Sequence, residues 1–189
     1  MEFTKMHGAG NDYVYIDASN ISEDWAQIAV NVSDRHKGIG SDGLILAMNS
    51  EIADIKMRMF NSDGSEGEMC GNGIRCLVSF AIDENLIQPD QKKVLVETGA
   101  GILTVEPIRT NNKMTGATVS MGLPILNPSQ IPVNIDSQQS AVLDHELTIG
   151  HEQMKLSFVS MGNPHAISFI EEDVDQYPLT DIGPLVETN

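Results

Sequence analysis

Cysteine, basic side chains and long apolar runs are all scarce in this chain of 189 residues. The two cysteines, Cys70 and Cys76, are too few and wrongly spaced for a Cys-rich zinc site, so we expect free thiols and no metal. Lysine and arginine total 11 against 27 acidic residues, a net charge of −16 that argues against nucleic-acid or anionic-lipid binding. No apolar run approaches the ~20 residues that span a membrane, and no signal-peptide pattern begins the chain. We therefore expect a cytoplasmic protein that binds no membrane.

The shortage of basic residues is greatest in the C-terminal part. After Lys113 the only lysine or arginine is Lys155, while acidic residues gather at 171–175. A solvated acidic surface explains this pattern. If this part binds a carboxylate, it has to use backbone N–H groups.

Short strands and glycine-rich turns dominate the pattern, and helices are few. The apolar spacing predicts strands at 3–7, 13–17, 44–48, 55–59, 94–98, 102–108, 117–121, 147–149, 154–159 and 165–170. A helix is expected with Ser22 as its N-cap and Gly38 at its end. The glycine runs at 8–10 and 38–40 are expected to be turns, because neither continues into a dinucleotide or Walker pattern. The fold class is α+β with mostly antiparallel strands.

A polar segment at 110–113 is the expected boundary between two lobes, 1–113 and 114–189. Residues 6–17 resemble residues 161–171, since each run reads Met, Gly, Asn and then an apolar strand that ends on an acid. A match this short arises by chance as readily as by duplication. If the repeat is real, the counterpart of Cys70 falls beyond Asn189.

Cys70 stands where a glycine-rich loop turns into a helix, and this makes it the leading candidate for a reactive group. Apolar residues at 74, 77, 78 and 81 keep a helical period from about residue 73 to 84. Cys70 therefore faces the unpaired N–H groups of the first turn, which favour the thiolate, the form that acts as a base. Cys76 lies on another face and is expected to be a core thiol. A redox pair is disfavoured, because a disulfide within this helix is geometrically poor.

Four runs of the chain together resemble the diaminopimelate epimerase family: FTKMHGAGNDY (3–13), DRHKGIGSDGL (34–44), FNSDGSEGEMCGNGIRC (60–76) and SMGNPH (160–165). The resemblance covers the whole chain in order. It implies two pseudo-symmetric lobes, each a mostly antiparallel sheet wrapped round a central helix. It also implies an isomerase without pyridoxal phosphate or any other cofactor, which interconverts LL- and meso-diaminopimelate for lysine and peptidoglycan biosynthesis. The implied partners are this small-molecule substrate and a second copy of the chain in a homodimer.

The chemistry of such a reaction explains why the family needs a cysteine at a helix start. Inverting a stereocentre without a cofactor takes a base that removes the α-proton and an acid on the opposite face that returns it, and two thiols can serve. The resemblance makes Cys70 one of these thiols and His165 a histidine that tunes their protonation. It places substrate contacts at Asn11, Asn61, Gly71, Asn72 and Asn163. From the residues alone, two alternatives stay open: Asn11 and Asn61 as ordinary turn residues, and His165 as an ordinary edge-strand histidine.

The chain also departs from the family pattern. Family members carry a second Cys-Gly helix, an acidic residue and an arginine that holds the distal carboxylate, and this chain has none of them. We therefore expect the second lobe to be incomplete and the chain, by itself, not to epimerise diaminopimelate. Two other interpretations stay open: a proline-racemase-like epimerase of another amino acid, and a non-catalytic remnant that binds a ligand.

Overall fold

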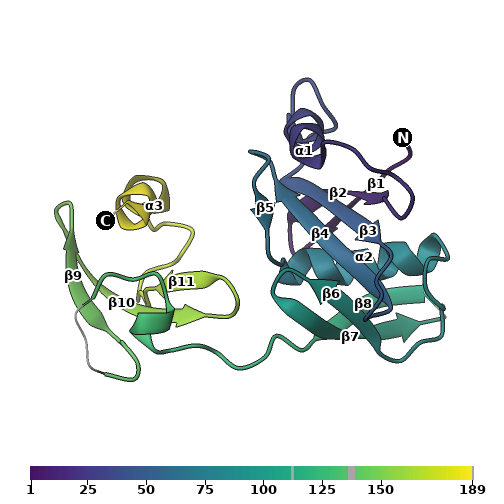
Figure 1. Cartoon of the computed structure of the whole chain (residues 1–189). Coiled ribbons are helices and arrows are strands. Elements are labelled where there is room, and N and C mark those ends of the chain that lie inside the picture. The colour runs from purple at the N-terminus through teal and green to yellow at the C-terminus, as the bar shows by residue number, and fades with distance from the viewer. Residues whose placement is uncertain (112, 136–138, 189) are drawn as a thin grey trace. The chain divides into compact units, whose positions relative to one another are not determined.

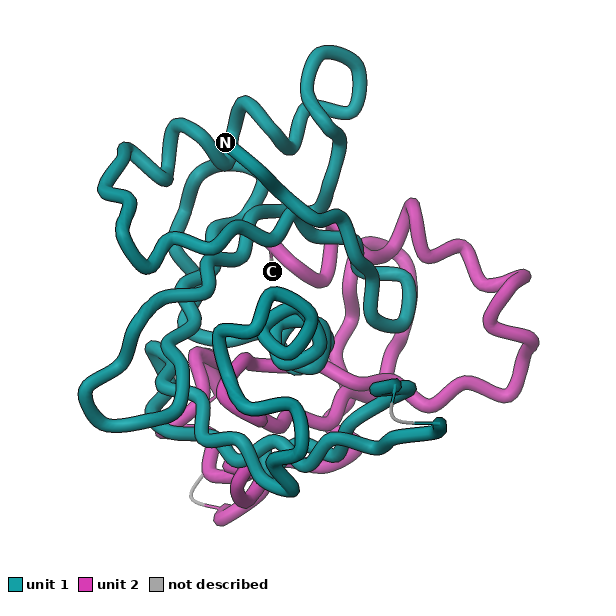
Figure 2. The backbone as a smooth tube through the Cα atoms, turned by 90° about the vertical axis from the view of Figure 1, so that its right-hand side faces the viewer, with its two compact units in different colours: residues 1–121 teal, residues 122–189 magenta. Residues whose placement is uncertain are grey.

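The computed structural model describes residues 1–111, 113–135 and 139–188. The chain divides into two compact units, residues 1–121 and 122–189, which Figure 2 draws in teal and magenta. The positions of the two units relative to each other are not determined, so each is described by itself. Within the described ranges, every helix is too short or too polar to cross a membrane.

Unit 1 is built on an eight-stranded sheet with the order β1-β2-β3-β4-β6-β7-β8, in which β5 pairs with β4 (Figure 1). Its strands are β1 (Thr4–Gly8), β2 (Asn11–Asp17), β3 (Gly43–Met48), β4 (Ile55–Asn61), β5 (Glu66–Gly67), β6 (Val94–Thr98), β7 (Gly101–Thr110) and β8 (Lys113–Val119). The pairs β2–β3 and β4–β6 are parallel, and the other pairs are antiparallel. The sheet is therefore mostly antiparallel, as expected.

Two helices of unit 1, α1 (Trp25–Ser33) and α2 (Gly71–Asp83), pack on separate hydrophobic clusters. Leu44 and Leu46 of β3 pack in the cluster of Trp25, whereas Ile45 packs in the cluster of Leu77. Successive side chains of a strand point to opposite faces, so a strand covered on both faces needs apolar residues throughout. Helix α2 contacts β1, β2, β3, β7 and β8, strands from both ends of the sheet order, so the sheet curls around this helix.

Helix α1 begins later and ends earlier than the sequence indicates. Asp24, not Ser22, is its N-cap, and the Asp24 carboxylate accepts a hydrogen bond from the backbone N–H of Gln27 at 3.1 Å. The helix ends at Ser33, before Gly38, because the Asp34 carboxylate binds the N–H groups of the two residues at 36 and 37 in a local turn. Both expected ends were therefore wrong, although the helix itself is present.

The glycine run at 8–10 is a turn, as predicted. It joins β1 to β2 in an antiparallel hairpin through Ala9 and Gly10, whose φ angles are 52° and 95°. Two successive positive φ angles give a tight hairpin turn that matches the twist of the strands.

The boundary between the units lies eight residues later than the 1–113 and 114–189 division, with unit 1 ending at Met121. Strand β8 pairs with β7 from Val119 opposite Val105 to Lys113 opposite Thr110, so it belongs to the sheet of unit 1. Thr110 and Lys113 of the polar segment pair with each other where β7 is followed by β8, and residue 112 between them lies outside the described residues.

The described residues of unit 2 form a three-stranded antiparallel sheet with the order β11-β10-β9 and one α-helix, α3. Its elements are a short 3-10 helix (Pro128–Gln130), β9 (His145–Ile149), β10 (Glu152–Ser160), β11 (Pro164–Ile167) and α3 (Leu179–Glu187). Strand β11 is shorter than expected, and all four of its residues are exposed. The sequence did not predict α3, because Pro184 lies inside it and proline is a helix breaker.

The two similar segments of the sequence have the same local form. Each is an antiparallel hairpin in which a glycine with positive φ comes directly before an asparagine. Gly10 (φ 95°) precedes Asn11, and Gly162 (φ 100°) precedes Asn163.

Candidate active site at the start of helix α2

Cys70 is the N-cap of α2, close to where the sequence places it. Its backbone is extended, with φ −135° and ψ 114°, and its Sγ accepts a hydrogen bond from the N–H of Gly73 at 3.3 Å. The thiol is half-buried. Gly73 lets the first turn pack closely on the sheet, because a Cβ there would lie only 2.4 Å from Cδ1 of Ile45. The sulfur is thus held at the start of the helix, beside the positive end of its dipole.

Gly71 and Asn72 are the first two residues of α2. Backbone N–H groups at these positions have no carbonyl partner within the helix, so they can bind an anion such as a carboxylate. Gly8 brings the β1–β2 hairpin against this turn, because a Cβ at Gly8 would lie 2.8 Å from the carbonyl oxygen of Asn72.

The structure brings together two predicted substrate contacts, Asn11 and Asn72, which are 61 positions apart in the chain. Nδ2 of Asn72 donates to Oδ1 of Asn11 at 2.7 Å. Nδ2 of Asn11 in turn donates to a carboxylate oxygen of Asp42 at 3.2 Å. Hydrogen bonds therefore link the Asn11 side chain to the first turn of α2 and to Asp42, while its role as a substrate contact stays a prediction.

Two basic side chains bind Asp12, the residue that follows Asn11. Arg35 donates to both carboxylate oxygens of Asp12, at 2.7 and 3.1 Å, and to Asp42 at 2.8 Å. Lys5 adds a second cation 3.0 Å from Asp12. The hydrogen bond from Arg35 is the largest cause that holds the pKa of Asp12 well below its usual range, and it outweighs the opposing effect of burial.

Arg75 forms hydrogen bonds with Asn72 and Gly71 within helix α2. Its Nη2 donates to Oδ1 of Asn72, and its Nε donates to the carbonyl oxygen of Gly71 at 3.2 Å. These partners lie three and four residues earlier in α2, the spacing at which helical side chains are neighbours.

Two buried tyrosines of β2 lie next to the first turn of α2. Burial raises the pKa of Tyr13, and its interaction with the neighbouring Cys70 thiol raises it further. The hydroxyl of Tyr15 donates to the carbonyl oxygen of Gly73 at 3.1 Å. Cys76 is buried in the same cluster, and burial raises the pKa of its thiol, so the prediction of a core thiol is confirmed.

Asn61 ends β4 at the same end of the sheet as Asn11. The register places Asn61 opposite Gly43, and Gly43 opposite Tyr13. The side chain of Asn61 is exposed and donates to Oγ of Ser65 at 2.9 Å. Its role as a substrate contact stays a prediction.

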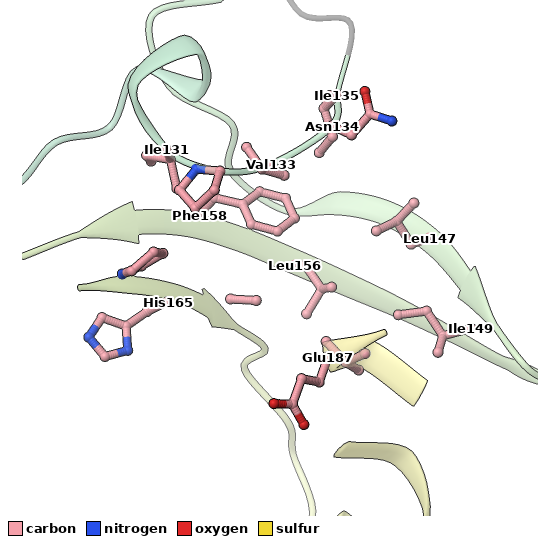
Figure 3. Close-up of a pocket in the computed structure, with 14 residues that line it drawn as sticks. Ile131, Val133, Asn134, Ile135, Leu147, Ile149, Leu156, Phe158, His165 and Glu187 are labelled. Atoms are coloured by element: carbon pink, nitrogen blue, oxygen red, sulfur yellow. The ribbon is translucent and has the colours of Figure 1, made fainter. Parts of the chain in front are cut away.

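Asn163 and His165 belong to unit 2. The carbonyl oxygen of Asn163 accepts a hydrogen bond from the N–H of Met161 at 3.2 Å. His165 lies opposite Val159 in the β10–β11 pair, and it lines a cavity of about 540 Å³ whose other lining residues are mostly apolar (Figure 3). Because unit 2 is described by itself, the approach of these two residues to Cys70 stays a prediction.

The sequence assigned no role to three residues that organise this site, Arg35, Asp42 and Arg75. The first two lie in the second family-like run and the third in the run of Cys70, so a signal was present. The sequence did not predict that β2 pairs with β3, and this pairing brings Asp42 beside Asn11. Among the described residues, no group of three His, Cys, Asp or Glu side chains is placed to hold a metal ion.

Comparison with known proteins identifies relatives over nearly the whole chain. A family profile described as diaminopimelate epimerase matches residues 3–126. Diaminopimelate epimerases of Methanococcus maripaludis and Acetivibrio thermocellus are 52% and 48% identical to this chain, each over 188 residues and 99% of its length. The match covers 66% and 65% of those relatives, so the chain spans about two thirds of their length.

Solved structures share the fold at low sequence identity. A hydroxyproline epimerase from Agrobacterium vitis matches 88% of this chain and 50% of its own, with a TM-score of 0.59 and 14% identity. A probable proline racemase from Agrobacterium radiobacter matches 96% of this chain and 52% of its own, with a TM-score of 0.59 and 13% identity. These likenesses concern the fold alone, and they confirm the expected α+β class.

Proposed function

The chain belongs to the diaminopimelate epimerase family, and from that premise we propose that unit 1 carries one of the two acid/base thiols of this reaction. Cys70 serves one face of the stereocentre: it removes the α-proton of one isomer from that face, and in the reverse reaction it delivers a proton to that face, while the other thiol serves the opposite face. The observation that carries the proposal is the position of the Cys70 sulfur at the N-cap of α2, beside Asn72 and Asn11.

The proton transfer follows from this geometry. The Cys70 thiolate takes the α-proton, and the electron pair of the C–H bond passes to the α-carbon and its carboxylate, which becomes enolate-like. Backbone N–H groups of Gly71 and Asn72 stabilise that charge, because the start of a helix favours an anion. One such donor is typically worth about 100-fold in rate. Asn11 and Asn61 contact the ammonium and carboxylate groups, since an amide both donates and accepts.

The opposite face of the stereocentre needs a second acid/base group. Cys76 is the only other cysteine of the chain, and it is buried in the core of unit 1. A single thiol exchanges the α-proton with solvent and keeps the configuration, whereas two thiols on opposite faces invert it. We assign Asn163 as a further polar contact and His165 as the histidine that tunes thiol protonation.

Hydrogen–deuterium exchange at the α-carbon tests this function directly. The 189-residue chain is incubated with LL-diaminopimelate in D2O, and NMR follows both the α-proton signal and the ratio of isomers. We expect slow loss of the α-proton signal without formation of the meso isomer. Cys70→Ala should lower the exchange to the uncatalysed rate, while the matched control Cys76→Ala should retain it.

Other results would contradict the proposal. Exchange that survives Cys70→Ala would remove this thiol from the mechanism, and exchange of proline but not of diaminopimelate would favour the alternative substrate. Neither binding nor exchange of either diaminopimelate isomer would favour a non-catalytic remnant. The family resemblance also implies a homodimer and a cytoplasmic location, which sedimentation and cell fractionation would test.

A further inference from the structure

Three hydrogen bonds connect four side chains beside Cys70, and all three run in one direction. Arg75 donates to Oδ1 of Asn72, Nδ2 of Asn72 donates to Oδ1 of Asn11, and Nδ2 of Asn11 donates to Asp42. We call these four side chains the relay. Its first member is on α2 and its last directly precedes β3, so distant parts of unit 1 meet in it.

The two ends of the relay determine this direction. A guanidinium group can only donate hydrogen bonds, and a carboxylate can only accept them. An amide can present either its NH2 or its oxygen, and it turns over by rotation about one bond. Arg75 therefore selects the oxygen of Asn72, and Asp42 selects the NH2 of Asn11. The two selections agree, because they leave the NH2 of Asn72 facing the oxygen of Asn11.

Turning over either amide alone would be unfavourable at both of its contacts. A reversed Asn72 would place its NH2 against the guanidinium of Arg75 and its oxygen against the oxygen of Asn11. A reversed Asn11 would place its oxygen against the carboxylate of Asp42. The asparagine contacts are part-buried, where unmatched polar groups are costly.

We propose that Arg75 and Asp42 are positioning residues that fix the orientation of the Asn11 and Asn72 amides, and so decide which amide atoms meet the α-ammonium and α-carboxylate groups of the amino-acid substrate. The link to substrate rests on the proposed function, whereas the orientation does not. Arg35 supports one end, because it holds Asp42 at 2.8 Å while it binds both oxygens of Asp12. Among the contacts of the described residues, each amide has one N–H and one oxygen lone pair left over, and the relay gives these a fixed place.

The relay makes an unusual prediction about combined substitutions. In Arg75→Ala the carboxylate of Asp42 still selects the direction, and in Asp42→Ala the guanidinium of Arg75 still does. When both ends are removed, the pair Asn11–Asn72 can form its hydrogen bond in either direction. The double variant should therefore change more than the sum of the single variants, as expected for residues in one network.

NMR of the side-chain NH2 groups in the 15N-labelled chain measures this. We expect one set of signals for Asn11 and Asn72 in the unsubstituted chain and in both single variants. The double variant should show two sets or an averaged one, and its side-chain amide protons should exchange with solvent about tenfold faster than in either single variant. Arg75→Lys should behave like the unsubstituted chain, because lysine also only donates.

Arg109→Ala is the matched control, since Arg109 lies in unit 1 and donates only to the carbonyl oxygens of Pro89 and Gln91 among the contacts described. It should leave both amide signals unchanged. Backbone signals of β2 and α2 report whether each variant folds. The proposal is overturned if Arg75→Ala alone produces the second set, or if a folded double variant keeps one set with unchanged exchange.

The same samples separate this inference from the proposed function. Adding meso-diaminopimelate to the unsubstituted chain should shift the side-chain signals of Asn11 and Asn72. If the single and double variants give the expected signals but diaminopimelate shifts none of them, the positioning role of Arg75 and Asp42 is supported and the proposed substrate is wrong. If they shift equally in the double variant and the unsubstituted chain, the substrate stands and the positioning role fails.

Discussion

Unit 1 and unit 2 contain the same kind of hairpin, yet the surroundings of the two hairpins differ. In unit 1 the β1–β2 hairpin lies against α2, and its Asn11 hydrogen-bonds to Asn72 of that helix. In unit 2 the β10–β11 hairpin ends in a strand whose four residues are all exposed, and Asn163 is exposed beside it. The hairpin therefore follows from local sequence, whereas the site needs a helix packed across it.

The hydrophobic cores of the two units also differ in how closely they are packed. Unit 1 has clusters on both sides of its sheet, with many side chains that are fully buried. Among its described residues, unit 2 has one smaller cluster, and Leu156 of this cluster lines two cavities, of about 540 and 410 Å³. Side chains that line a void lack contacts on one side, so they contribute less to stability.

The largest expected difference between the units is in their response to the same core substitution. Leu77 of α2 is fully buried, and Leu77→Ala should destabilise unit 1 by about 3–4 kcal/mol. Leu156→Ala should destabilise unit 2 by less, about 2 kcal/mol, because this buried side chain lines two cavities and has fewer contacts to lose. Urea unfolding measures both, with the fluorescence of Trp25 for unit 1 and NMR signals of β10 for unit 2.

Leu77→Val, a smaller truncation at the same site, is the control and should cost less than Leu77→Ala. Equal losses from the two alanine substitutions would show that unit 2 is packed as tightly as unit 1.

An intermediate difference is expected in acid. The pKa values of Asp12 and Glu97 are held below their usual ranges, mainly by hydrogen bonds from Arg35 and Lys56. The unfolded chain then binds protons more readily than folded unit 1, so the stability of unit 1 should fall as the pH drops below about 4. The urea midpoint of the Trp25 fluorescence, measured from pH 6 to pH 3, checks this, and Asp12→Asn should flatten the slope.

Unit 2 should respond in the opposite sense. Lys155 is its only lysine or arginine, so unit 2 carries a large net negative charge, whose mutual repulsion opposes the compact form and weakens as the pH falls. NMR signals of β10 should keep or raise their urea midpoint over the same pH range. A parallel fall in both units would mean that their responses to acid do not differ.

The smallest difference is expected at the two hairpin glycines. Gly10 and Gly162 have nearly the same positive φ, so alanine at either position should cost about 1–2 kcal/mol of strain. Both costs should be equal, which the urea midpoints of the two units would show. A cost at Gly10 alone would mean that the two turns are alike only in form.

Much of unit 1 was predictable because its signals are local. The apolar period of residues 74–81 indicated a helix from 73 to 84, and the structure has it at Gly71–Asp83. The strand at 94–98 agrees with β6 at both ends. The start of α2 was also predictable, so Cys70, Gly71 and Asn72 were found together.

The rest depended on contacts between distant residues. Arg75 and Asp42 look like ordinary surface charges in the sequence. The pairing of β2 with β3 brings Asp42 to Asn11, and the packing of α2 on the β1–β2 hairpin brings Asn72 to Asn11. The sequence did not predict helix α3, because a proline interrupts its pattern. It placed β8 in the second lobe, because the polar segment before β8 resembles a linker between lobes. Sequence patterns identify elements well, and they identify the partners of those elements poorly.

The Cys70 sulfur performs two tasks at once, since the atom proposed to carry the proton also accepts the hydrogen bond that begins α2. Any covalent bond formed at this sulfur, by alkylation or oxidation, would therefore loosen the first turn as well as remove the base. Serine or aspartate would cap the helix better by general preference, yet neither supplies a thiol. With the proposed role of Cys70, unit 1 accepts a weaker helix start in exchange for proton-transfer chemistry, a local trade-off between stability and activity.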